Sequence, residues 1–197
     1  MDSITSGALV SCCRRALRLD PDVRDAIPHM MVMLDKVLER AHEFDLIHFH
    51  TDYFHFPFCR FCSTPMLTTL HGRQDLIDHM PLYGRFSRMP LVSISNAQRA
   101  PLPHANFIRT IYHGLPLDLH SARSRAAGGY LAFLGRISPE KGLDRAIAIA
   151  RAAGMPLKIA AKVDYRDKPY YREILEPLLA QPDIEFVGEI NDAAKTE

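Results

Sequence analysis

The stretch that decides the fold reads YLAFLGRISPEKG (residues 130–142). Its apolar start is typical of a short buried strand that ends at Leu134, and Gly135 lets the backbone turn tightly or approach a ligand. Ser138 can cap a helix whose first position is Pro139, where the missing N–H costs nothing. A strand followed directly by a helix is part of a βαβ unit, so this stretch predicts a parallel sheet.

Arg136 and Lys141 flank the start of that helix. A helix that begins at the carboxyl end of a strand offers free N–H groups and the positive end of its dipole. The two cations could clamp two phosphates there, arginine as a fork and lysine as a point charge. The same residues also suit an ordinary capped helix with two solvated cations, and both interpretations stay open. Neither G-x-G-x-x-G nor G-x-x-x-x-G-K-S/T occurs, so a dinucleotide fingerprint or a P-loop is not indicated.

Strand and helix patterns alternate over most of the chain. Short apolar runs predict strands at residues 46–50, 66–70, 91–95, 107–111, 130–134, 157–161 and 184–187. Apolar residues at helical spacing predict helices at residues 22–44, 139–153 and 170–180. Pro28 is expected in a first turn or at a kink. The alternation predicts an α/β fold with mainly parallel sheets.

The composition is that of a folded, nearly neutral chain. Its 197 residues amount to about 1.3 times a typical domain of roughly 150 residues. Hydrophobic residues make up 47%, which argues against intrinsic disorder. The net charge of +1 argues against a dedicated nucleic-acid binder. No apolar run approaches the ~18 residues of a membrane span, so no transmembrane segment is expected.

The residue types change partway along the chain. All ten histidines and all four cysteines lie in residues 1–120. The polar, small-residue stretch at 121–129 has no periodic apolar positions, which is typical of a linker. We therefore expect a partial Rossmann-like domain over residues 1–120, a linker over 121–129, and the first part of a second Rossmann-like domain over 130–197.

The cysteines bear on the compartment. Cys12, Cys13, Cys59 and Cys62 are too few for a secreted fold built on disulfides. The N-terminus has no charged region followed by an apolar core, so no signal peptide is indicated. These two observations predict a cytoplasmic protein.

A second candidate site lies in the first half of the chain. His48 and His50 project from the same strand face, and His55, Cys59 and Cys62 follow closely. Imidazole and thiolate are zinc ligands, so this group could bind a zinc ion. Phenylalanines alternate with these residues, and no second C-x-x-C or H-x3-5-H pair occurs. The pattern therefore favours a packed segment, and we expect no metal site.

Several motifs, in order, resemble those of one family. LGRISPEKG (134–142) is similar to the donor-diphosphate motif that opens the C-terminal domain of GT-B retaining glycosyltransferases of group 1 (family 4). FDLIHFH (44–50) and PMLTTLHG (65–72) resemble two successive strands of the family's N-terminal domain. Three shorter segments also resemble family motifs, the second with His113 in place of the common Asn: LVSISNAQR (91–99), IYHGL (111–115) and FVGEI (186–190).

The resemblance implies an activity and a set of site residues. The family transfers a sugar from a nucleotide diphosphosugar, here expected to be UDP-linked, to an acceptor with retention of anomeric configuration. The reaction takes place in the cleft between an acceptor-side domain and a nucleotide-sugar domain, and no cofactor is implied. His71 would be the catalytic contact to the donor sugar, with His50 and His113 on the acceptor side. The donor-binding residues would be Gly135, Arg136, Lys141, Val187, Gly188 and Ile190.

Parts of the family pattern have no counterpart here. The family's opening strand with its Gly-rich loop is not found before residue 22, and its E-x7-E segment would follow residue 197. The sequence AKVD (161–164) stands where many members carry a Gly-rich turn. The chain therefore resembles a fragment truncated at both ends. A truncated, non-catalytic α/β protein that binds a nucleotide or a partner is the alternative.

Overall fold

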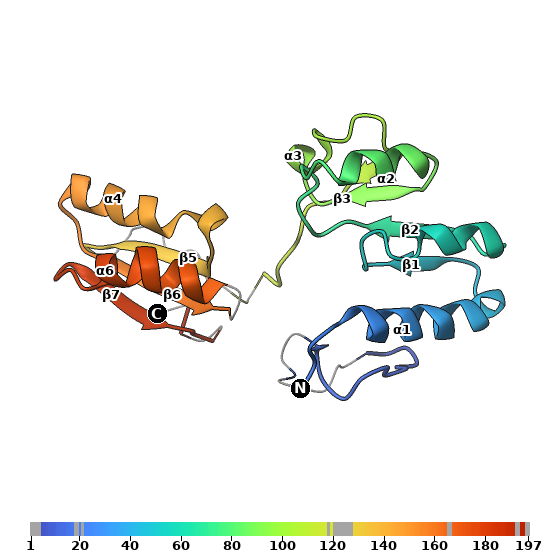
Figure 1. The fold of residues 1–197 in the computed structure, drawn as a ribbon, viewed down its shortest axis with the longest axis horizontal. Coiled ribbons are helices and arrows are strands. Elements are labelled where there is room, and N and C mark those ends of the chain that lie inside the picture. The colour runs from blue at the N-terminus through green and yellow to red at the C-terminus, as the bar shows by residue number, and fades with distance from the viewer. Residues whose placement is uncertain are drawn as a thin grey trace. The chain divides into compact units, whose positions relative to one another are not determined.

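The computed structural model describes residues 5–17, 20, 22–117, 119, 128–164, 167–191 and 194–195. The chain divides into two units, Met1–Gly114 (unit 1) and Leu115–Glu197 (unit 2), which are described separately (Figure 1). Residues 121–127 of the expected linker lie outside the described residues. Within the described ranges, no helix combines the length and the apolar character needed to cross a membrane.

Unit 1 is built on a four-stranded parallel sheet with the strand order β1-β2-β3-β4. The strands are β1 (Ile47–Phe49), β2 (Met66–Thr69), β3 (Leu91–Ser93) and β4 (Phe107–Thr110). The helical elements are α1 (Ile27–Glu39), η2 (Ala41–Glu43), η3 (Phe56–Phe61), α2 (His79–Arg85) and α3 (Asn96–Arg99). Because all four strands run in the same direction, their carboxyl ends lie at one edge of the sheet.

The first helix is shorter than its apolar pattern predicts. It begins at Ile27, whose backbone N–H donates to Asp25 Oδ1 at 2.9 Å, and Pro28 lies in its first turn as expected. It ends at Glu39, and a 3-10 turn follows. Helices α2 and α3, with seven and four residues, were not predicted because they are too short to show a periodic apolar pattern.

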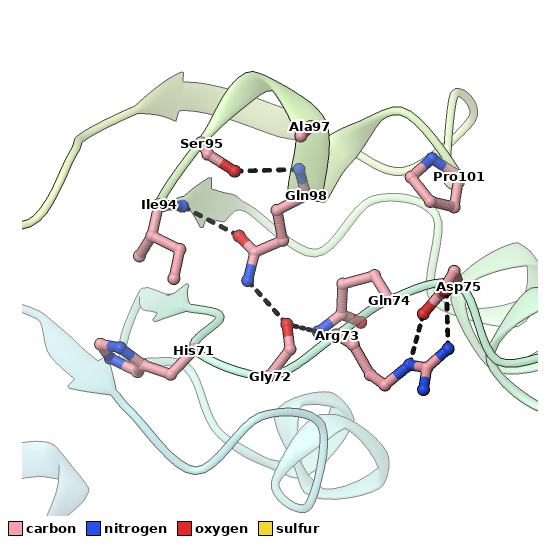
Figure 2. A pocket seen from close by; sticks show the side chains of 10 residues that line it. All are labelled: His71, Gly72, Arg73, Gln74, Asp75, Ile94, Ser95, Ala97, Gln98 and Pro101. Atoms are coloured by element: carbon pink, nitrogen blue, oxygen red, sulfur yellow. Dashed lines mark hydrogen bonds and ion pairs between the residues drawn. The ribbon is translucent and has the colours of Figure 1, made fainter. Parts of the chain in front are cut away.

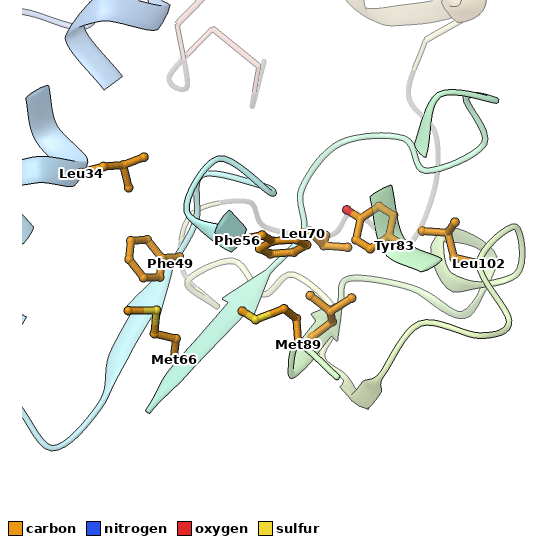
Figure 3. Packing of buried hydrophobic residues seen from close by; sticks show 9 residues of the cluster. Leu34, Phe49, Phe56, Met66, Leu70, Tyr83, Met89 and Leu102 are labelled. Carbon is orange, nitrogen blue, oxygen red and sulfur yellow. The ribbon is translucent and has the colours of Figure 1, made fainter. Parts of the chain in front are cut away.

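The core of unit 1 gathers residues from α1, the strands and the connecting segments (Figure 3). Phe56 is fully buried, and its ring contacts those of Tyr83 and Phe86 at centroid distances of 5.9 and 5.6 Å. These ring contacts hold the 3-10 helix that carries Phe56 against α2 and the residue that ends it. The buried members of this core are Leu34, Phe49, Phe56, Met66, Leu70, Tyr83, Met89, Leu91 and Leu102.

Unit 2 is a three-stranded parallel sheet with the strand order β5-β6-β7. Its strands are β5 (Leu131–Ile137), β6 (Leu157–Val163) and β7 (Ile184–Gly188). Its helical elements are η4 (Pro139–Lys141), α4 (Leu143–Ala153), α5 (Lys168–Tyr170), the π-helical turn η6 (Tyr171–Leu175) and α6 (Glu176–Leu179). The two parallel sheets confirm the predicted α/β class, and each of the seven strands overlaps one of the seven expected ranges.

The helices of unit 2 pack on one face of its sheet. Ile147 of α4 and Leu175 of η6 share a core with Ile159 of β6, and all three are almost fully buried. Side chains alternate along a strand, so the neighbouring positions point to the opposite face. There Leu134 and Val187 are 61% and 49% exposed.

The expected strand-turn-helix at residues 130–153 is wrong in three details. Strand β5 does not end at Leu134 but runs to Ile137, because β6 pairs with it over its whole length and Gly135 lies opposite Ala161. The expected helix is divided into a 3-10 turn and α4 by Gly142, which has a left-handed backbone with φ +68°. The Ser138 side chain makes no capping hydrogen bond.

The helix expected at residues 170–180 is present, with an irregular middle. The π-helical turn η6 comes immediately before the turn that carries Pro177. Proline lacks an N–H and its ring clashes with the carbonyl four residues earlier, so it disturbs the regular hydrogen-bond ladder at this point.

Two glycines give opposite expectations for the same substitution. Gly142→Ala is expected to lower the free energy of unfolding of unit 2 by about 1–2 kcal/mol, because an L-residue is strained in the left-handed region. Gly84→Ala is expected to raise that of unit 1 by about 0.5–1 kcal/mol, because Gly84 lies in α2 with open space around a new methyl group. Urea unfolding monitored for each unit checks both, and equal changes would contradict the backbone explanation.

Candidate functional site

Four histidines form a row at the carboxyl edge of the sheet of unit 1. His48 lies in β1 and His50 directly follows it, whereas His71 and His113 follow β2 and β4. The ring nitrogens His50 Nδ1 and His71 Nε2 are 2.8 Å apart, within hydrogen-bonding distance. The rings of His71 and His113 stack with centroids 5.3 Å apart and planes within 7°. His71 therefore contacts both His50 and His113, three residues that were expected from separate motifs. The ring of His48 lies 4.4 Å from that of His50, and we call His48, His50, His71 and His113 the histidine row.

Two imidazoles of the histidine row, His50 and His71, have a lowered pKa, which favours their neutral form. Partial burial lowers the pKa of His50, and the neighbouring His48 lowers it further. Burial likewise lowers the pKa of His71, with smaller contributions from His50 and His113, while Asp52 opposes them. A neutral imidazole offers one N–H donor and one acceptor nitrogen, so His50 and His71 can exchange hydrogen bonds with a hydroxyl-rich ligand.

A pocket of about 310 Å³ opens beside His71 (Figure 2). One wall is the loop that follows β2, and the other is the turn from β3 into α3. Arg73 pairs with Asp75 through two short contacts of 2.7 and 2.8 Å, so both side chains contribute charge to the first wall. The lining residues are His71, Gly72, Arg73, Gln74, Asp75, Ile94, Ser95, Ala97, Gln98 and Pro101.

The pocket includes residues that sequence reasoning did not single out. Ser95 caps α3 by accepting a hydrogen bond from the backbone N–H of Gln98 at 3.0 Å. The spacing S-x-x-Q at residues 95–98 is the signal that predicts such a cap. Gln74, which is 3% exposed, has no comparable signal in the sequence, because its place in the pocket wall depends on how the loop after β2 folds.

The candidate zinc ligands do not converge. His55 is fully buried, with Nε2 2.9 Å from Thr68 Oγ1 and its ring stacked 3.7 Å from that of Phe49. Cys59 Sγ donates to the carbonyl of Phe56 at 2.8 Å. Across the part of the chain that the structure describes, no group of three or more His, Cys, Asp or Glu side chains could hold a metal ion. His55 and its neighbours belong to the core, as the packed-segment interpretation predicts.

Arg136 is the centre of the charged site in unit 2. Its side chain lies near the carboxyl end of β5, on the face that the helices leave open, and is 47% exposed. Its guanidinium donates to Glu140 at 2.7 Å and lies 3.9 and 3.8 Å from the carboxylates of Asp164 and Asp167. Lys141 is exposed in the following 3-10 turn. An anion bound here would compete with carboxylates for Arg136.

The other predicted donor contacts lie at the same edge of this sheet. Val187 and Gly188 end β7, and Ile190 follows. Gly188 has a left-handed backbone with φ +85°, which turns the chain at this point. Gly135 lies inside β5 rather than at a turn. The structure thus gathers the end of β7 and the Arg136–Lys141 segment at one edge, and their role in donor binding stays a prediction.

Similarity to known proteins is found among solved structures, and not among family models or curated sequences. No family model matches the chain, and no curated protein matches it significantly. Among solved structures, it is similar to AviGT4, a glycosyltransferase involved in avilamycin A biosynthesis, with a TM-score of 0.49 and 22% sequence identity. The match covers 83% of this chain and 45% of AviGT4, so the chain spans less than half the length of that protein.

Proposed function

We propose that the chain is part of a GT-B glycosyltransferase of group 1 that transfers a sugar from a UDP-linked donor to an acceptor with retention. The observation that carries the proposal is the contact of His71 with both His50 and His113, which lie at the ends of three different parallel strands. The carboxyl ends of parallel strands are where α/β sheets bind ligands. The order of the sequence motifs supports the same assignment.

The proposed reaction divides its tasks between the two groups of residues. The bond between the anomeric carbon and the donor phosphate oxygen breaks, and a bond from that carbon to the acceptor hydroxyl oxygen forms. The proton of that hydroxyl passes to the departing diphosphate. Arg136 and Lys141 would neutralise the charge that develops on the departing nucleotide diphosphate. His71 would contact the donor sugar near the reacting carbon, with His50 and His113 toward the acceptor. The proposal includes no metal or other cofactor.

The carboxylates around Arg136 do not prevent diphosphate binding. Exposed ion pairs contribute little stability, because water screens them and two side chains must be held in place. A diphosphate carries more charge than any one carboxylate and can accept several N–H bonds from one guanidinium. We therefore expect the diphosphate to displace the Glu140 carboxylate and to bind the Arg136 guanidinium in its place.

The alternative is a chain that binds a nucleotide or a partner without turnover. The three carboxylates near Arg136 favour the partner-binding form of this alternative, because they reduce the positive potential that attracts a diphosphate. The two proposals differ in whether UDP-sugar is consumed. Release of UDP from UDP-glucose or another UDP-sugar, lost in His71→Ala, supports the enzyme, whereas UDP binding with no release supports the alternative.

Calorimetric titration with UDP tests the donor site. Arg136→Ala is expected to weaken UDP binding roughly 10- to 100-fold, the loss of a hydrogen bond to a charged group of about 1.5–3 kcal/mol. Arg151→Ala removes the same charge from the exposed end of α4 and is expected to leave binding unchanged. Glu140→Gln is expected to tighten binding, because it removes the competing carboxylate. Equal affinities for all four proteins would contradict the assignment.

The expected compartment is the cytoplasm. All four cysteines are free thiols, which a reducing compartment preserves. Expression of the tagged chain followed by cell fractionation addresses this directly.

A further inference from the structure

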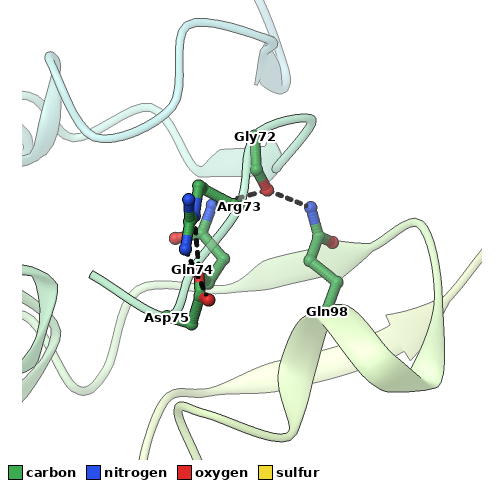
Figure 4. A network of polar contacts seen from close by, with 5 residues as sticks. All are labelled: Gly72, Arg73, Gln74, Asp75 and Gln98. Carbon is green, nitrogen blue, oxygen red and sulfur yellow. Dashed lines mark hydrogen bonds and ion pairs between the residues drawn. The ribbon is translucent and has the colours of Figure 1, made fainter. Parts of the chain in front are cut away.

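One side chain, Gln98, joins the ends of two strands beside His71 (Figures 2 and 4). Its Nε2 donates to the carbonyl of Leu70 at 3.0 Å and to the carbonyl of Gly72 at 2.8 Å. Its Oε1 accepts from the backbone N–H of Ile94 at 2.9 Å. The amide therefore links the segment after β2 with the segment after β3.

The two accepting carbonyls stand on either side of His71. Leu70 is fully buried and continues the sheet through its N–H, which donates to the carbonyl of Val92 at 3.0 Å. Gly72 is exposed and accepts a second hydrogen bond from Gln74 Nε2 at 3.2 Å. Because Gln98 holds both carbonyls with one NH2 group, it restricts the backbone that carries the His71 ring.

We propose that Gln98 is a positioning residue for His71: its side-chain amide fixes the backbone at Leu70 and Gly72 so that the His71 ring meets His50 and His113. The link to catalysis rests on the proposed function, in which His71 contacts the donor sugar. The effect of Gln98 on the position of the His71 ring does not depend on that function. A misplacement of about 1 Å in such a contact is enough to reduce turnover on the order of 100-fold.

An ordinary helix cap does not account for these contacts. The cap of α3 is the bond from the Gln98 backbone N–H to Ser95 Oγ, and it does not use the Gln98 side chain. The helix has only four residues, so its cap has little helix to stabilise. The side chain instead reaches backbone 26 and 28 residues earlier in the chain.

The unmodified chain provides the first test. The two Nε2 protons of Gln98 are expected to exchange with solvent on the order of tenfold more slowly than those of the exposed Asn96, because each donates to a carbonyl. NMR measurement of side-chain amide exchange gives this ratio without any substitution. Equal exchange rates would overturn the proposal.

Variants provide the second test, with the ring of His71 as the readout. Gln98→Met removes all side-chain hydrogen bonds at similar size, whereas Gln98→Glu keeps an acceptor for Ile94 and loses both donors. Both are expected to shift the ring ¹⁵N signals of His71 and its titration curve. Ser95→Ala removes the helix cap but leaves the Gln98 amide, and it is expected to leave the His71 signals in place.

The outcomes separate the two proposals. If Ser95→Ala shifts the His71 signals as strongly as Gln98→Met does, Gln98 only supports the local fold and the positioning role is wrong. If the Gln98 variants shift His71 while the chain neither binds UDP nor releases it from UDP-glucose, the positioning role stands and the proposed glycosyl transfer fails. If transfer occurs, Gln98→Glu is expected to lower kcat with little change in KM for the donor.

Discussion

Replacing Phe56 with alanine is expected to lower the free energy of unfolding of unit 1 by about 3–5 kcal/mol. Phe56 is fully buried in η3, where its ring contacts the rings of His55, Tyr83 and Phe86. Truncation removes these contacts and leaves a cavity that the short 3-10 helix and the sheet can fill only in part. The loss also loosens the segment between β1 and β2. His50 begins this segment, and His71 follows β2.

Phe61→Ala is the matched control for Phe56→Ala. Phe61 ends the same 3-10 helix but is 88% exposed, so its truncation is expected to change stability by no more than about 0.5 kcal/mol. The chain has no tryptophan, and hydrogen exchange of peptides from each unit during urea unfolding reports the two units separately. Unit 2 has its own core and is expected to be unaffected by either change. Similar losses for both variants would contradict the assigned core.

Unit 1 is also expected to lose about 3 kcal/mol of stability between pH 6.5 and pH 4 through His55 alone. Burial lowers the pKa of His55 to about 4 from its ordinary value of 6.5. His55 Nε2 forms a hydrogen bond with Thr68 Oγ1, while His55 Nδ1 is buried with no hydrogen-bond partner among the described residues. The charged ring would therefore bury an N–H that has no acceptor.

The sign of this effect follows from which state holds the proton. Above pH 6.5 His55 is neutral in both the folded and the unfolded chain, and the effect is absent. As the pH falls below 6.5, His55 binds a proton in the unfolded chain but not in the folded chain, so the free energy of unfolding decreases. Below pH 4 both states are protonated and the loss is complete. The pKa difference of about 2.5, at about 1.36 kcal/mol per pKa unit, sets its size.

His55→Gln provides the control for the titration. Glutamine can still hydrogen-bond to Thr68 but does not titrate, so the slope of stability against pH between 6.5 and 4 is expected to flatten. The comparison uses slopes, because the substitution itself changes packing against Phe49. His42→Gln, in the turn η2, replaces an exposed histidine and is expected to leave the slope unchanged. A slope that His55→Gln does not alter would show that His55 is not the group responsible.

The fold was more predictable from the sequence than the site, because strand patterns depend on residues that are neighbours in the chain. Each strand is a run of apolar or β-branched residues between turn residues, and such a run is visible without knowledge of its neighbours. The end of β5 was misplaced because pairing with β6 continues the strand past Gly135 to Ile137. Helices α2 and α3 were not predicted because their few residues show no period. In each case partners from elsewhere in the chain decided the local structure.

The residues of the site were predictable from local motifs, but the contacts between them were not. The motifs at residues 44–50, 65–72 and 111–115 pointed to His50, His71 and His113 one at a time. Their contacts depend on four strands, β1 to β4, pairing in parallel with their carboxyl ends at one edge, which no single motif contains. The ion pairs from Arg136 to Asp164 and Asp167 depend in the same way on the neighbouring strand and the segment after it.

The sequence by itself determined the α/β class, the positions of the seven strands, and the residue types available for a site, because these depend on local patterns along the chain. Only the tertiary structure decided that four histidines share one row, that Gln98 bonds to the carbonyls on both sides of His71, and that carboxylates surround Arg136. The physical reason is that these contacts join residues far apart in sequence. Their distances depend on strand order and register, which are set by the packing of the whole sheet.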